Sequence, residues 1–159
     1  MVLEHTYPVA PAALLGFLTD PQYQAARLER FGGVGDPQIA TNGSQIEGRG
    51  TRQLPKDKLP AAAAPFVGDG QLVQVDTWQS DTDPVQGTWK AEVGTAPVDL
   101  GGTYTITATD DGCTYSVGAT VKVNVPFFGR QLEPQIESYL TSLVTAEQEF
   151  LGEWVAEHG

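Results

Sequence analysis

The C-terminal stretch of this chain, residues 117–159, reads VGATVKVNVPFFGRQLEPQIESYLTSLVTAEQEFLGEWVAEHG. Its valine-rich beginning, Val117 to Val125, is typical of a β-strand, and Pro126 ends that strand. The residues that follow have the apolar period of a long amphipathic helix. One face of this helix carries Phe128, Leu132, Ile136, Tyr139, Leu140, Leu143, Ala146, Phe150, Leu151 and Trp154. Because burial stabilises each large apolar side chain by roughly 1.5 to 3 kcal/mol, we expect the helix to lie across an apolar sheet.

The rest of the chain reads mostly as strands. Val2 to Val9 predicts a first strand, Pro11 begins a short helix, and Asp20 followed by Pro21 caps and begins a second one. Further strands are expected at about Val34 to Ala40, Gln45 to Leu54, Gln71 to Gln79, Val85 to Val93, Val98 to Thr109 and Cys113 to Val125. Helices segregated from a run of antiparallel strands define the α+β class. We therefore predict one domain, residues 1–159, in which a curved antiparallel sheet of about seven strands wraps around the long C-terminal helix.

Composition excludes several classes of function. The net charge of −11 argues against nucleic acid as a partner. No run of 18 apolar residues and no export signal is present, so we expect a cytoplasmic protein without membrane insertion. The single cysteine, Cys113, permits no intrachain disulfide, and no metal-ligand spacing occurs. Because phosphate-binding and dinucleotide fingerprints are also missing, no cofactor is expected.

Alternation along the later strands indicates which aromatic side chains face inward. Trp89, Tyr104 and Tyr115 fall on the apolar faces of their strands and could form the walls of a cavity. Strand 71–79 has two possible orientations. If its valines point inward, Trp78 and Asp76 are exterior; if Trp78 points inward, Asp76 is a carboxylate inside the cavity and a candidate acid or base.

Polar residues on or near the terminal helix supply further candidates. Glu147 falls within the apolar face, where a carboxylate must reach solvent, pair with a cation or bind a ligand. We expect it to line or edge the cavity, either by extending to solvent at an edge of the sheet or as a polar anchor for a ligand, opposite Arg49 or Arg52. Phe150, on the same helix, is a candidate contact for a ligand. His5, on the first strand, is the only histidine placed to take part in acid–base chemistry.

Both ends of the chain resemble a known superfamily. The opening Tyr7-Pro8-Val9-Ala10-Pro11 through Phe17-Leu18-Thr19-Asp20-Pro21 and the helix entry Pro126-Phe127-Phe128-Gly129-Arg130-Gln131-Leu132-Glu133 are similar to those of the START-like, or SRPBCC, superfamily. That superfamily includes the major birch pollen allergen, lipid-transfer domains and polyketide cyclases. Within it the chain is most similar to a bacterial domain of unknown function 2505 family. The resemblance implies a helix-grip fold with a cavity between sheet and helix.

Three functions are compatible with these patterns. The first is a protein that binds a hydrophobic small molecule or lipid through Trp78, Trp89, Tyr104, Tyr115, Glu147 and Phe150, as a monomer or homodimer. The second is a cyclase-like or aromatase-like enzyme that uses Asp76, Glu147, His5 or Tyr104 as acid or base. The third is a module with a filled interior that binds partners at its surface. Clustered inward polar groups favour the enzyme, and a uniformly apolar lining favours the carrier. The segment Lys56 to Val67 could act as a lid.

Overall fold

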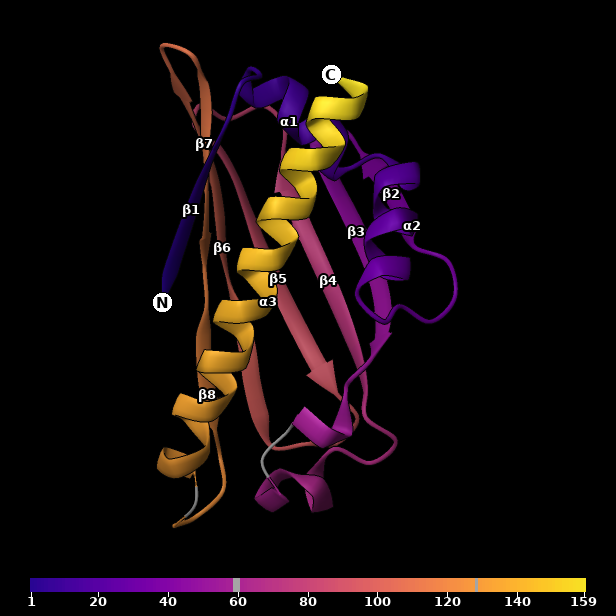
Figure 1. Ribbon diagram of the computed structural model, residues 1–159, viewed down its shortest axis with the longest axis vertical. Coiled ribbons are helices and arrows are strands. Elements are labelled where there is room, and N and C mark those ends of the chain that lie inside the picture. The colour runs from indigo at the N-terminus through magenta and orange to yellow at the C-terminus, as the bar shows by residue number, and fades with distance from the viewer. Residues whose placement is uncertain (59–60, 128) are drawn as a thin grey trace.

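The computed structural model describes residues 1–58, 61–127 and 129–159. A single sheet forms the body of the molecule, and one long helix lies diagonally across it (Figure 1). The elements are β1 (Val2–Tyr7), α1 (Pro11–Leu18), α2 (Pro21–Arg30), β2 (Gln38–Asn42), β3 (Gln45–Gln53), η1 (Lys56–Lys58), η2 (Ala61–Phe66), β4 (Gln71–Gln79), β5 (Val85–Val93), β6 (Val98–Thr109), β7 (Gly112–Gly118), β8 (Thr120–Val123) and α3 (Gly129–His158). The predicted bounds of β4, β5 and β6 are confirmed to the residue.

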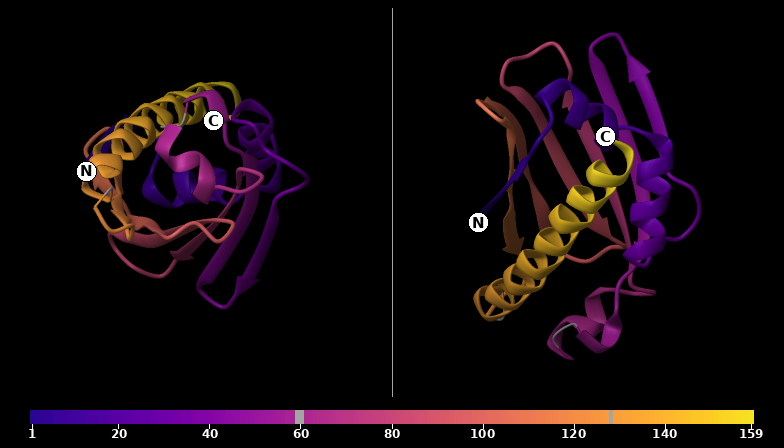
Figure 2. Two further views of the ribbon diagram at one scale, coloured as in Figure 1. Left: turned by 90° about the horizontal axis from the view of Figure 1, so that it is seen from below. Right: turned by 45° about the horizontal axis from the view of Figure 1, so that its top comes forward.

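The sheet has the order β1-β7-β6-β5-β4-β3-β2, and β8 pairs with β6. Every pairing among these strands is antiparallel. The sheet curves around α3, so its concave face and the helix enclose the core (Figure 2). This arrangement confirms the α+β class and the helix-grip fold.

The sheet has eight strands where the sequence predicts about seven. The segment expected as one strand, 113–125, is divided at Ala119 into β7 and β8. At the division, the indole Nε1 of Trp89 donates a hydrogen bond to the carbonyl of Gly118 at 2.9 Å. Gly102, opposite on β6, has no side chain to obstruct the Gly118 backbone. The break therefore depends on residues from two neighbouring strands, which local patterns cannot show.

The two short helices form as expected. Pro11 is the first residue of α1, and Pro21 is the first residue of α2. The Asp20 side chain accepts a hydrogen bond from the backbone N–H of Gln22 at 2.8 Å, which satisfies a free donor in the first turn of α2. Because α2 contacts both α3 and β3, its inner face meets the core.

The buried face of α3 is turned relative to the predicted face. Of the predicted face, Leu132, Leu140 and Leu151 are buried, whereas Ile136, Tyr139, Leu143, Phe150 and Trp154 are half-buried. Gln148 and Val155, outside the predicted face, are buried in their place. The polar side chain of Gln148 is accommodated because its amide nitrogen donates to the backbone carbonyl of Leu3. The backbone carbonyl of Gln148 accepts a hydrogen bond from the Tyr7 hydroxyl. The predicted position of Phe128 on this face lies outside the described residues. None of the described helices is long and apolar enough to cross a membrane.

Candidate functional site

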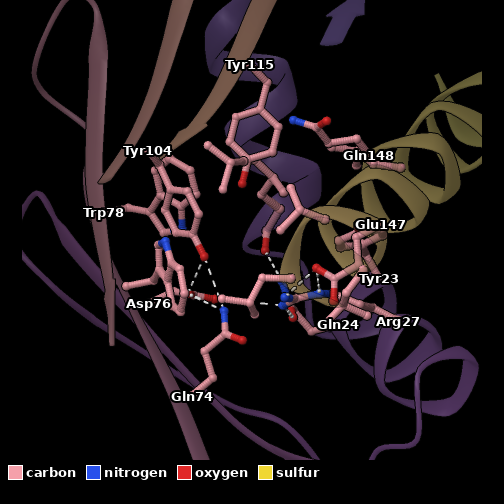
Figure 3. A pocket seen from close by; sticks show the side chains of 17 residues that line it. Tyr23, Gln24, Arg27, Gln74, Asp76, Trp78, Tyr104, Tyr115, Glu147 and Gln148 are labelled. Carbon is pink, nitrogen blue, oxygen red and sulfur yellow. Dashed lines mark hydrogen bonds and ion pairs between the residues drawn. The ribbon is translucent and has the colours of Figure 1, made fainter. Parts of the chain in front are cut away.

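A cavity of about 60 Å³ lies between the concave face of the sheet and α3. Its walls come from the end of α1, from α2, from strands β4 to β7 and from α3 (Figure 3). A single water molecule needs about 10 to 15 Å³ on this scale, so the space suffices for a few waters or for a compact group of similar size.

One wall of the cavity is aromatic. Trp78 of β4 and Tyr104 of β6 stack with ring centroids 4.7 Å apart and planes inclined by 13°. They reach each other across β5 because Gly87 stands between them in register. A Cβ atom at Gly87 would lie 2.8 Å from the Trp78 ring, so only glycine leaves the stack undisturbed. Tyr115 of β7 continues the wall, with its ring centroid 5.8 Å from that of Tyr104.

The orientation of β4 is settled in favour of the inward tryptophan. Trp78 is 3% exposed, and Asp76, two residues earlier on the same face, is also inside with a side chain 13% exposed. The Oδ1 atom of Asp76 accepts hydrogen bonds from the Tyr104 hydroxyl at 2.7 Å and from Gln74 Nε2 at 2.9 Å. A carboxylate, a phenol and an amide thus form a connected group on the sheet side of the cavity.

Glu147 of α3 forms an ion-paired cluster on the helix side. Its Oε2 atom accepts from Arg27 Nη2 at 2.8 Å and Nε at 3.1 Å, and its Oε1 atom accepts from Arg52 Nη1 at 2.8 Å. Burial raises the pKa of Glu147, but the charges and hydrogen bonds of the two guanidinium groups outweigh it and lower the pKa from 4.5 to about 2. The carboxylate is therefore held ionised inside the protein.

The tyrosine hydroxyl groups of the aromatic wall are neutral. Burial, reinforced by the charge of Asp76, raises the pKa of Tyr104 and of Tyr115 well above the usual range. The Tyr104 hydroxyl is engaged with Asp76. Tyr115 lines the cavity, and Figure 3 shows its hydroxyl oxygen pointing into it. This hydroxyl is available to a guest molecule as a donor or an acceptor.

Most of the predicted site residues meet at this cavity. Trp78, Trp89, Tyr104, Tyr115 and Glu147 all line it. Of the two arginines expected opposite Glu147, Arg52 is the one in contact with it.

Several other predicted residues lie outside the cavity lining. Phe150 does not line the cavity but stacks on Tyr23 with centroids 5.9 Å apart, because the turn of α3 directs it toward α2. Arg49 is exposed, because it lies three residues from the inward Arg52 and so on the opposite face of β3. His5 lies against Tyr7, with ring centroids 4.7 Å apart and planes inclined by 39°, and is not part of the cavity lining. No described residue of the expected lid, 56–67, lines the cavity.

Arg27 of α2 is a site residue that the sequence analysis did not predict. It contacts Glu147 directly, and Gln24 on the same helix accepts a hydrogen bond from its Nη1 atom at 3.0 Å. A signal was present, because Arg27 follows the buried Tyr23 by four residues and so shares its helix face. Gln74 was also missed, although it shares the inward face of Asp76.

A known protein family matches almost the whole chain in sequence. The sequence profile described as "Protein of unknown function (DUF2505)" matches residues 3–155. The chain belongs to the DUF2505 family. No curated protein matches the chain in sequence.

Solved structures share the fold at low sequence identity. TTHA0849 of Thermus thermophilus superposes with a TM-score of 0.67 at 13% identity, covering 100% of this chain and 99% of that one. The ZhuI aromatase/cyclase of Streptomyces sp. R1128 superposes with a TM-score of 0.59 at 12% identity, covering 98% and 93%. The di-domain aromatase/cyclase StfQ of the steffimycin pathway gives 0.59 at 11% identity, covering 98% of this chain and 48% of that one. At these identities the likeness shows the fold of this DUF2505 protein and no activity.

Proposed function

We propose that this protein binds a small, planar, polar-substituted molecule in the cavity between the sheet and α3. The observation that carries the proposal is the pairing of an aromatic wall with polar atoms that face the same space. Trp78 and Tyr104 offer flat apolar surface, and Tyr115 offers a hydroxyl that points into the cavity. Such a combination of apolar walls and a few placed polar groups is typical of small-molecule sites.

The size of the cavity restricts the class of ligand. Its volume of about 60 Å³ is well below the roughly 150 Å³ in which benzene binds a protein interior. A single ring therefore needs modest movement of the lining side chains, whereas a lipid acyl chain needs a much larger rearrangement. Of the ligands expected from sequence, these dimensions favour a compact aromatic molecule over a lipid.

Native mass spectrometry of the freshly purified protein, followed by ligand-observed NMR with a panel of single-ring compounds, tests this function. The variant Val144→Phe places a ring into the cavity lining on α3, and we expect it to abolish binding. Thr145→Phe is the matched control, because the neighbouring residue is exposed on the same helix. Equal binding by both variants would show that the ligand lies elsewhere. Absence of any ligand in wild type would favour the alternative of a surface interaction module.

A second candidate function is acid–base catalysis by Asp76. It is favoured by the position of this carboxylate inside the cavity, 2.7 Å from the neutral hydroxyl of Tyr104. A carboxylate base can take a proton from carbon next to a carbonyl. The Tyr104 hydroxyl already donates to Asp76, so the donor to the resulting enolate oxygen is the Tyr115 hydroxyl on the same wall. The aromatase/cyclases that share the fold supply an analogy and no more.

Hydrogen–deuterium exchange at the α-carbon of a bound small ketone, followed by NMR in D₂O, tests this candidate. We expect exchange catalysed by wild type to be lost in Asp76→Asn. Glu92→Gln is the control, because it removes one exposed carboxylate from the outer face of β5. Exchange no faster than in buffer would restrict the function to binding.

A further inference from the structure

Arg27 and Asp76 face each other in the cavity as an ion pair that is not closed by a direct hydrogen bond. The Nη1 atom of Arg27 lies 3.8 Å from the Oδ2 atom of Asp76. This separation exceeds the 2.7 to 3.2 Å of a direct N–H···O bond. It is short enough for one oxygen atom to lie at about 2.9 Å from both atoms.

Both sides of the gap between Arg27 and Asp76 have unused hydrogen-bonding capacity. Arg27 has five N–H donors, and its bonds to Glu147 and Gln24 engage one hydrogen on each of its three nitrogens. A second Nη1 hydrogen therefore remains. On the other side, Tyr104 and Gln74 both donate to Oδ1 of Asp76, and no donor from the described part of the chain is within hydrogen-bond distance of Oδ2.

The atom that fits this gap must accept one hydrogen bond and donate another. It accepts from Arg27 Nη1 and donates to Asp76 Oδ2. A hydroxyl group does both, whereas an ether or carbonyl oxygen only accepts and an ammonium group only donates. The gap therefore selects for a hydroxyl.

The charges around the gap exclude an ionic ligand. Two guanidinium groups, Arg27 and Arg52, face two carboxylates, Asp76 and Glu147, in one connected cluster. Their formal charges cancel. A charged guest would add an uncompensated charge to a largely buried site, which is costly.

The aromatic wall begins beside the same gap. The Tyr104 hydroxyl donates to Asp76, and its ring stacks on Trp78, so a ring attached to a hydroxyl in the gap is placed next to flat aromatic surface (Figure 3). We propose that Arg27 and Asp76 form a hydroxyl-recognition subsite, and that the ligand is a neutral, hydroxylated single-ring compound of the phenol or enol type. This inference rests on the proposed binding function and specifies its ligand class.

Four test ligands of similar size separate the possibilities: phenol, toluene, benzoate and benzylammonium. Binding is measured by isothermal titration calorimetry and ligand-observed NMR on the full chain. We expect wild type to bind phenol about 10- to 100-fold more tightly than toluene, the range for a hydrogen bond to a charged partner. Benzoate and benzylammonium should bind more weakly than phenol.

The variant Asp76→Asn tests the role of the carboxylate without relying on loss of binding. It preserves side-chain volume and leaves the cluster with one excess positive charge. We therefore expect the preference for phenol over toluene to shrink and the affinity for benzoate to rise at least several-fold. Glu92→Gln, which changes the net charge of the protein equally but lies outside the cavity, should leave all four affinities unchanged.

The outcomes distinguish this inference from the function on which it rests. If toluene and phenol bind equally, the gap is bridged by water only, which overturns the hydroxyl subsite and leaves the binding function intact. If benzoate binds wild type more tightly than phenol, the assigned ligand class is wrong. If none of the four ligands binds, both the subsite and the binding function are overturned.

Discussion

Glu147 shows how one buried charge is tolerated in this protein. The sequence alone suggests a ligand anchor at this position, and the pairing of Glu147 with Arg27 and Arg52 provides a different role. Glu147→Gln leaves two largely buried guanidinium groups with Asp76 as the remaining carboxylate of the cluster, so one positive charge is uncompensated. We expect the substitution to lower the free energy of unfolding by roughly 3 kcal/mol. Urea denaturation measures the effect. Glu149→Gln, at an exposed position two residues away, should change it by no more than about 0.5 kcal/mol.

The same carboxylate predicts an acid-dependent loss of stability. Its pKa is about 2 in the folded protein against an ordinary value of 4.5, so the unfolded state binds its proton first as the pH falls. The stabilisation is complete above about pH 5 and is lost as the pH falls toward 2, with a total of about 3 kcal/mol from this shift. Urea denaturation at a series of pH values between about 5 and 2 should therefore show that the free energy of unfolding depends less steeply on pH in Glu147→Gln than in wild type. Parallel slopes would contradict the lowered pKa.

The packing of the central strands depends on the absence of a side chain at Gly87. Gly87 of β5 lets Trp78 and Tyr104 stack across it, and a Cβ atom would approach the indole ring to 2.8 Å and the Thr77 carbonyl to 2.9 Å. We expect Gly87→Ala to destabilise the protein by about 1 to 3 kcal/mol and to change the near-ultraviolet circular dichroism of the stack. Gly48→Ala on β3, where no atom lies within 4 Å of the added carbon, is the control. Similar losses at both positions would mean that strand propensity, not the stack, sets the cost.

The difference between the buried face of α3 and the predicted face leads to a second prediction about this helix. Leu151 is 1% exposed, whereas Ile136 and Trp154, which the helical period places at the centre of the face, are half-buried. Leu151→Ala should cost about 2 to 5 kcal/mol and should exceed the cost of Ile136→Ala. Thermal melting ranks the stability of these two variants and of Glu153→Ala, a control on the exposed side of α3. An Ile136 variant as unstable as the Leu151 variant would favour the face predicted from sequence.

For the whole molecule, the continuous sheet predicts cooperative unfolding. Seven strands pair in one unbroken order, and α3 contacts both β1 and β8, which lie at different positions in the sheet. We expect residues 1–159 to unfold in a single transition, with tryptophan fluorescence and far-ultraviolet circular dichroism giving the same midpoint. Two separate midpoints would contradict the single-domain prediction.

Strands, helices and the α+β class could be predicted because they arise from local regularities. Alternation identified β4, β5 and β6, and Asp20-Pro21 identified the start of α2. The inward face of β4 could not be assigned, because Val73 and Val75 on one side and Leu72 and Trp78 on the other are both apolar enough to be buried. The phase of α3 was also misjudged, since hydrogen bonds with β1 make the polar Gln148 acceptable in the core.

The chemistry of the cavity depends on contacts between distant parts of the chain. Arg27 is separated from Glu147 by 120 residues and Arg52 by 95, and periodicity contains no information about which cation meets which carboxylate. The 3.8 Å gap between Arg27 and Asp76 likewise requires α2 and β4 to be docked against each other. Local patterns of polarity were thus enough to specify the elements and their order. The charge pairs, the hydroxyl-sized gap and the volume of the cavity arise only when the sheet closes around α3, because each is a distance between residues that the sequence holds apart.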